Sequence, residues 1–190
     1  MGTLEREIRQ RDKKAFIKKA VLNSIAVAGV LSLALLAPNA IQLLKPFVKK
    51  QRKKYIAYSI SQAVSRLQKQ NLIYFEQTSR GKFVRLTEKG EQYLRAHIDE
   101  MPKPKRWDGK WRILVFDIKE NKRRIRDQLR ISLTRIGFEP LQRSVWVYPY
   151  DCEDFIFLLK ADFKIGKEIL YIVADKIEND SFLKNIFGLK

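Results

Sequence analysis

The stretch WRILVFDIKE, from Trp111 to Glu120, begins with six nearly unbroken apolar positions and places a carboxylate, Asp117, where the apolar run stops. A short apolar run of this kind is typical of a buried strand. A carboxylate at its end either completes the strand or belongs to a site for a metal or a phosphate group. The strand is therefore the starting point from which we predict the fold of the second half of the chain.

The segments after this strand predict an α/β sandwich. Apolar residues recur at helical spacing from Ile125 to Ile136, with Asn121 placed to cap the helix and Gly137 to end it. The β-rich segment LQRSVWVYPY, the amphipathic segment DCEDFIFLLKADFKIG and the apolar segment KEILYIVADKI follow. The order β-α-β-α-β, with the second β segment kinked into two short antiparallel strands, predicts a ferredoxin-like sandwich over residues 107–190.

Both predicted helices would cover the same face of this sheet. The opposite face is then left without cover. Several large apolar residues need cover there, which predicts a dimer through the sheet or docking on the first half of the chain. These residues are Trp111, Ile113, Val115, Trp146, Tyr148 and Tyr171.

Charge is the most informative bulk property of the 190-residue chain. The net charge is +18, and residues 1–100 hold 20 basic against 8 acidic residues. Such an excess favours a polyanionic partner, either nucleic acid or an anionic membrane surface. The chain has a single cysteine, Cys152, and a single histidine, His97, which excludes an internal disulfide and a metal cage of thiolates or imidazoles. A reducing cytoplasm is the expected location.

The first 54 residues form a basic lead, an apolar segment and a basic run. Residues 20–37 carry no charge, which predicts either a buried helix or a membrane anchor that would place the protein at the inner membrane. The basic run that follows is either a solvated helix face or a contact with phosphates. Its candidate DNA-contacting residues are Lys49, Lys50, Arg52, Lys53 and Lys54.

Residues 55–98 predict a winged helix-turn-helix region. A helix over 59–70 would begin with a capping box formed by Ser59 and Gln62. The runs LIYFEQ and KFVRL, joined by TSRG, predict a hairpin, and Thr87 is placed to cap a further helix. Residues 99–106, with two prolines and no apolar periodicity, predict a linker.

The outward face of the helix over 59–70 would enter the major groove of double-stranded DNA. The hairpin would form the wing, held against phosphates or the minor groove. The alternative is a small packing module with a solvated basic face. The candidate base-reading residues are Gln62, Ser65, Arg66 and Lys69, and the candidate wing residues are Arg80, Lys82 and Arg85.

The motifs WDGKWRILVFDI, LQRSVWVYPY and ADKIEND, together with a basic helix that ends in GF, resemble the central domain of PaaX-like transcriptional repressors. That domain is related to the CRISPR-associated Cas-two family of small ferredoxin-like dimers. The resemblance implies a winged helix followed by a Cas-two-like domain in a homodimeric DNA-binding regulator, with repression as the expected mode and no required cofactor. Family repressors usually continue into a C-terminal domain, and this sequence ends before one, so the acyl-CoA effector of PaaX is not carried over.

The same resemblance implies a rival, enzymatic function. Cas-two nucleases place an aspartate at the end of the first strand, and the two copies in a dimer hold one divalent metal; Asp117 matches this position. A bound Mg²⁺ would activate water against a phosphodiester. The acidic residue that such enzymes often carry after SVF is replaced here by Val147, and capping or a salt bridge is the structural alternative for Asp117.

Overall fold

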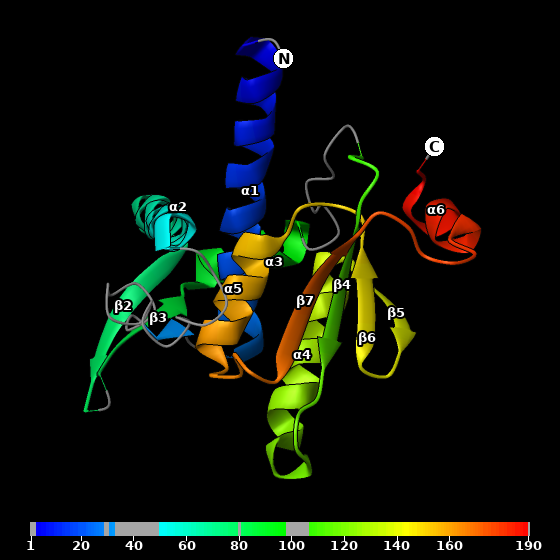
Figure 1. The fold of residues 1–190 in the computed structure, drawn as a ribbon. Helices are drawn as coiled ribbons and strands as arrows, with labels where there is room; N and C mark the ends of the chain where they lie inside the picture. The colour runs from blue at the N-terminus through cyan, green and yellow to red at the C-terminus, as the bar shows by residue number, and fades with distance from the viewer. Residues whose placement is uncertain (1–2, 29–30, 33–49, 80, 98–106, 190) are drawn as a thin grey trace.

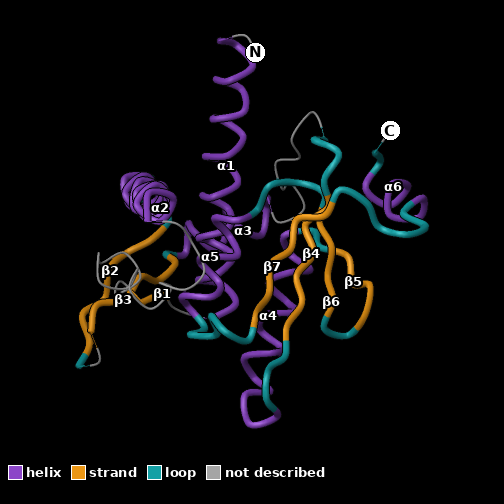
Figure 2. The backbone as a smooth tube through the Cα atoms, viewed as in Figure 1, coloured by secondary structure: helices purple, strands orange, loops and turns teal. Residues whose placement is uncertain are grey.

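The computed structural model describes residues 3–28, 31–32, 50–79, 81–97 and 107–189, which form two units in mutual contact (Figure 1). The first unit contains α1 (Thr3–Ala28), β1 (Leu31–Ser32), α2 (Lys50–Lys69), β2 (Ile73–Thr78), β3 (Gly81–Leu86) and α3 (Glu88–His97). The second contains β4 (Trp111–Phe116), η3 (Glu120–Lys122), α4 (Arg123–Ile136), β5 (Glu139–Gln142), β6 (Val145–Tyr148), α5 (Glu153–Asp162), β7 (Ile169–Ala174) and α6 (Ser181–Phe187). Figure 2 shows one small sheet with helices around it, and a second sheet with the longer helices α4 and α5 on one face.

The predicted hairpin of the first unit is confirmed. Strands β2 and β3 pair antiparallel from Ile73 opposite Leu86 to Thr78 opposite Gly81, and β1 adds to β3, so that the sheet order is β1-β3-β2. Gly81 closes the turn with a φ of 121°, a value that residues with a Cβ rarely adopt. The predicted linker over 99–106 lies outside the described residues.

The start of α3 is fixed against the end of α2. Thr87 caps α3, because the backbone N–H of Gly90 donates to its hydroxyl at 3.0 Å. The Thr87 hydroxyl donates in turn to the carbonyl of Asn71 at 2.7 Å, and the Thr87 backbone N–H donates to the carbonyl of Leu72 at 3.1 Å. The predicted cap is confirmed, and it joins α3 to the loop between α2 and β2.

The second unit has the β-α-β-β-α-β order of a ferredoxin-like sandwich. Its four strands are antiparallel in the order β5-β6-β4-β7. The kinked middle segment is the β5–β6 hairpin, as predicted. Helix α4 ends at Gly137, whose φ of 94° is left-handed, but Asn121 lies in η3 and does not cap α4.

The sheet of the second unit buries its two faces differently. On the face covered by α4 and α5, Leu114 and Phe116 pack with Leu129, Leu133 and Phe155. The prediction that Trp146, Tyr148 and Tyr171 lie on the opposite face is wrong, because all three pack in this helix-covered core.

The opposite face is only partly covered within the chain. Trp111 and Val147 are buried beneath Leu183 of α6. Farther along the same face Leu170 is 59% exposed and Ile172 is 37% exposed. A short C-terminal helix therefore covers one end of this face and leaves apolar side chains open at the other.

Helix α1 joins the two units. Phe16 packs on Tyr148 and Phe155 of the second unit, with 6.4 Å between ring centroids in both cases. Leu22 of the same helix packs in the core of the first unit together with Leu158 of α5. The first half of the chain thus docks on the helical side of the sandwich and not on the open face of its sheet.

The uncharged segment 20–37 is not one continuous helix. Helix α1 ends at Ala28, and Leu31–Ser32 form a strand. Residues 20–25 are buried, and the Asn23 side-chain amide donates to the carbonyl of Ser132 in α4 at 3.3 Å. The buried-helix interpretation is confirmed for these residues. Among the described ranges, no helix has the length and apolar character needed to cross a membrane.

Candidate nucleic-acid interface

Helix α2 presents one buried and one exposed face. Its buried face consists of Ile60, Ala63, Val64 and Leu67, each at most 4% exposed, at the predicted helical spacing. On the opposite face Ser65, Arg66 and Lys69 are exposed and Gln62 is half-buried. The structure thus places the four predicted base-reading residues away from the buried face of one helix, and two of them, Gln62 and Arg66, also line a groove toward α1.

The predicted start of this helix is wrong. Helix α2 begins at Lys50 and not at Ser59, so Ser59 and Gln62 lie inside the helix and form no capping box. The basic residues before Ser59 continue the helix because lysine, arginine and glutamine are good helix formers. The Gln62 amide is therefore not engaged at a helix terminus and belongs to the outward face.

The basic run 45–54 is only partly within the described residues. Lys49 lies outside them. The first turns of α2 contain Lys50, Arg52, Lys53 and Lys54.

Two exposed tyrosines extend the outward face of α2. Tyr55 is 52% exposed and Tyr58 is 64% exposed. Tyr58 precedes Gln62 by four residues, a spacing that places the two on the same side of a helix. Neither tyrosine was among the residues predicted from the sequence, although this spacing would have identified Tyr58. Exposed aromatic rings beside cations can stack on bases or pack against a sugar-phosphate backbone.

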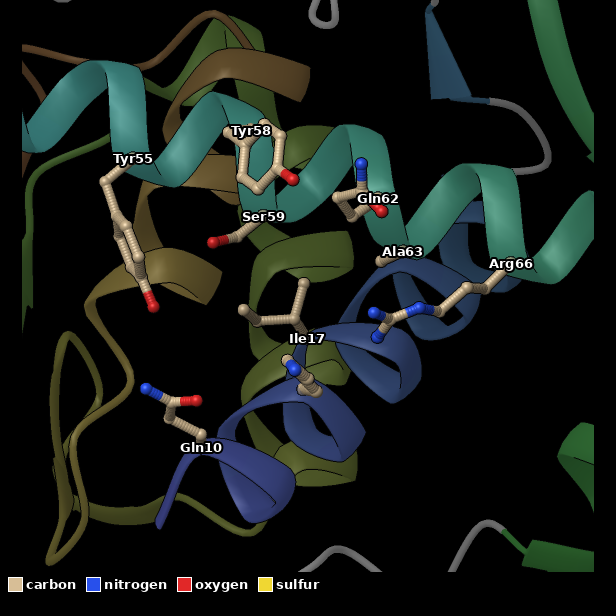
Figure 3. Close-up of a pocket in the computed structure, with 9 residues that line it drawn as sticks. Gln10, Ile17, Tyr55, Tyr58, Ser59, Gln62, Ala63 and Arg66 are labelled. Atoms are coloured by element: carbon tan, nitrogen blue, oxygen red, sulfur yellow. The ribbon is translucent and has the colours of Figure 1, made fainter. Parts of the chain in front are cut away.

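A groove of about 220 Å³ separates α2 from the N-terminal half of α1. Figure 3 shows Tyr55, Ser59 and Arg66 extending from α2 toward α1. Lys14 and Gln10 line the α1 wall, so a cation from each helix faces the groove. Arg66 is thus positioned where an anionic group would meet a second positive charge. Lys14 is a further candidate residue that the sequence analysis missed.

The wing residues have different surroundings. Lys82 is exposed, and its ammonium lies 4.9 Å from the centre of the Phe75 ring. Arg85 forms an ion pair and hydrogen bond with Glu76 on the neighbouring strand, and this hydrogen bond raises the pKa of Arg85. Arg80 lies outside the described residues. Of the two described candidates, Lys82 is the cation that is available to a phosphate.

Asp117 is exposed and lies directly after β4. Its backbone N–H donates to the carbonyl of Glu168 at 2.9 Å. Within the described residues its carboxylate has no hydrogen bond or ion pair, so neither the cap nor the salt bridge expected for it is found there. The nearby Glu168 carboxylate is paired with Lys122 at 2.9 Å, and this hydrogen bond lowers the pKa of Glu168.

One chain offers few metal ligands around Asp117. Mg²⁺ sites use one or two carboxylates together with waters and substrate phosphates. Here the nearby Glu168 carboxylate is already paired with Lys122, and across the described ranges no group of three or more histidine, cysteine, aspartate or glutamate residues is arranged to hold a metal ion. Any metal at this position would need the second copy of Asp117 that the resemblance implies.

Comparison with known proteins identifies the second unit. Residues 104–183 match the family model described as PaaX protein central Cas2-like domain. The predicted resemblance is therefore confirmed over this stretch, which is less than half of the chain. No curated protein matches the chain.

Proposed function

We propose that this protein is a DNA-binding transcriptional regulator of the PaaX-like type that acts as a homodimer, with repression as its mode. The match of residues 104–183 agrees with a PaaX-like regulator at the level of the family. The observation that carries the proposal of DNA binding is the outward face of α2, where Gln62, Ser65, Arg66 and Lys69 lie together. The proposal requires no cofactor.

The topology of the first unit supports a winged helix. A helix and a short strand precede α2, and the hairpin after α2 pairs with that strand in the order β1-β3-β2. In a helix-turn-helix protein the recognition helix lies in the major groove, and a preceding helix crosses the backbone. Residues 33–49, between β1 and α2, lie outside the described residues.

The recognition chemistry follows from the side chains on α2. Arginine donates two hydrogen bonds to guanine, and glutamine pairs in the same bidentate way with adenine. Arg66 and Gln62 are therefore the proposed base readers. Lys69 on α2 and Lys82 on the wing are proposed to contact phosphates, which positions the helix without reading sequence.

The open part of the second sheet supports a homodimer. Leu170 and Ile172 are exposed beside the half-buried residues Ile113 and Val115 on the same face. A two-fold pairing would place this patch of one copy against the same patch of the other and remove both from water. Two winged helices related by that axis would read two half-sites separated by about one helical turn or a multiple of it.

Replacement of Arg66 by alanine tests the assignment of this residue to base reading. Loss of one bidentate base contact costs about 1–3 kcal/mol, so we expect Arg66→Ala to weaken binding to a preferred duplex by about tenfold or more. Binding to random duplex should fall much less. Fluorescence anisotropy with both duplexes measures the two affinities.

Arg95→Ala is the matched control, because Arg95 is an exposed arginine on α3, and within the described residues its ion pair is with Glu91. It should leave the preference for the selected duplex unchanged. An equal loss of affinity for both duplexes in Arg66→Ala would mean that Arg66 contacts phosphate only.

A further inference from the structure

Three loops meet at the end of the second sheet where β4 finishes. We call them together the sheet-end surface: residues 117–124, 142–145 and 163–168. The Phe116 N–H donates to the carbonyl of Ser144 at 3.0 Å, and the Asp117 N–H donates to the carbonyl of Glu168 at 2.9 Å. Figure 1 shows all three loops at the lower end of the view, far from α6 at the opposite end of the sheet.

The sheet-end surface carries a concentrated positive charge. It contains seven basic and three acidic residues. Lys122 is neutralised by Glu168, and Glu120 is paired with Arg126 at 2.9 Å. Five exposed cations drawn from all three loops have no ion pair within the described residues: Lys119, Arg124, Arg143, Lys164 and Lys167.

The backbone adds to this positive field. Helix α4 is 14 residues long and begins in this surface directly after η3, so its first N–H, that of Arg123, donates to the carbonyl of Glu120, and no side chain caps the helix. The positive end of the helix dipole favours an anion at this position. The unpaired cations and the uncapped helix start thus point to the same kind of ligand.

The absence of exposed apolar side chains distinguishes nucleic acid from a lipid surface. Large exposed apolar side chains occur elsewhere in the described chain, for example Ile131 on α4 and Leu170 on β7, but none lies in these three loops. Helices and loops that bind a membrane surface normally insert apolar anchors below the headgroups. A phosphate backbone needs only cations and N–H donors.

We propose that the sheet-end surface is a second binding site for the phosphate backbone of double-stranded DNA, separate from α2. This inference rests on the proposed function for its choice of DNA as the polyanion. The proposed contacts are with phosphates, which carry no sequence information. It gives the Cas-two-like domain a direct part in DNA binding.

Asp117 has a defined role in this surface. Its unpaired carboxylate lies among the cations and repels phosphate, which limits the affinity of the site for any duplex. Removal of this charge should therefore strengthen binding. A catalytic Asp117 would instead be recognised by loss of Mg²⁺-dependent cleavage when it is replaced.

The test compares two triple variants of the full chain on a random duplex of about 40 base pairs, long enough to span both proposed sites at about 3.4 Å per base pair. The first variant, Lys119→Gln with Arg143→Gln and Lys167→Gln, removes one unpaired cation from each loop. The matched control neutralises three lysines at the opposite end of the same sheet: Lys110→Gln with Lys176→Gln and Lys184→Gln. Both variants carry the same net charge.

We expect the sheet-end variant to bind the random duplex at least about tenfold more weakly than the control variant, since each phosphate contact contributes separately to affinity. Asp117→Asn should bind it about threefold more tightly than the unchanged protein. Affinities of the two triple variants within about twofold of each other would overturn the inference. The inference would also be overturned if the sheet-end variant lost binding to vesicles of mixed phosphatidylserine and phosphatidylcholine but kept its affinity for DNA. The α2 assignment fails separately, through an unchanged sequence preference in Arg66→Ala.

Discussion

We expect the proposed DNA binding to weaken by about three orders of magnitude when the salt concentration is raised from about 50 mM to about 200 mM. Each neutralised phosphate releases counterions and contributes about 0.9 to the slope of log affinity against log salt concentration. The proposed contacts from α2, the wing and the sheet-end surface together provide on the order of six such phosphates. Titrations of one duplex at several salt concentrations measure the slope.

Single substitutions measure how much each proposed phosphate contact contributes to this slope. Lys69→Gln should lower it by about 0.9, because it removes one proposed phosphate contact. Lys176→Gln is the matched control: Lys176 is exposed at the end of the sheet opposite the sheet-end surface, and its loss should leave the slope unchanged. A flat salt response of the unchanged protein would remove nucleic acid as its partner.

Gly90→Ala is expected to lower the free energy of unfolding by about 3 kcal/mol, because overpacking against backbone cannot be relieved by a rotamer change. A Cβ at this position would lie 2.0 Å from the carbonyl oxygen of Leu72. That oxygen also accepts the hydrogen bond of the Thr87 N–H. Neither α3 nor the loop after α2 can therefore move away without breaking this hydrogen bond. Urea denaturation followed by circular dichroism measures the change.

Gln92→Ala is the matched control for this substitution, since Gln92 is exposed on the same helix. Its free energy of unfolding should remain within about 0.5 kcal/mol of the unchanged protein. An equally small effect of Gly90→Ala would show that α3 does not pack on the loop after α2 as described.

The helices and strands of the second unit could be predicted because the apolar residues of each follow the spacing typical of a helix or of a strand. The apolar run from Trp111 to Phe116 and the helical spacing from Ile125 to Ile136 match β4 and α4 closely. The faces of the sheet were harder to predict. From Val145 to Tyr150 no charged or strongly polar residue alternates with the apolar ones, so the sequence does not show that Trp146 and Tyr148 face the helices.

The contact between the two units could not be read from the sequence. Helix α1 reads as a charged lead followed by an apolar segment, yet Phe16 packs in one core and Leu22 in the other. This arrangement depends on α5, which is buried on almost every side and contributes Phe157 and Leu158 to the first unit. Long-range packing of this kind leaves no local periodicity in the sequence.

The candidate site was predicted in part. The i, i+3, i+4, i+7 spacing from Ile60 to Leu67 identified the buried face of α2, and the outward face with Arg66 follows from it. The start of the helix was missed because Ser59 mimics a cap in a sequence whose preceding residues also favour helix. The groove toward Lys14 was missed because it joins residues on two helices that are far apart in the sequence.

Selection of duplexes from a random-sequence pool by the full chain, followed by sequencing, tests the central claim most directly. We predict enrichment of a sequence that contains two related half-sites with dyad symmetry, separated by about one helical turn or a multiple of it. The same selection with Arg66→Ala should lose enrichment at specific base positions in each half-site. A pool that shows no enrichment over the input, with the unchanged protein at low and moderate salt, would contradict sequence-specific DNA binding by α2.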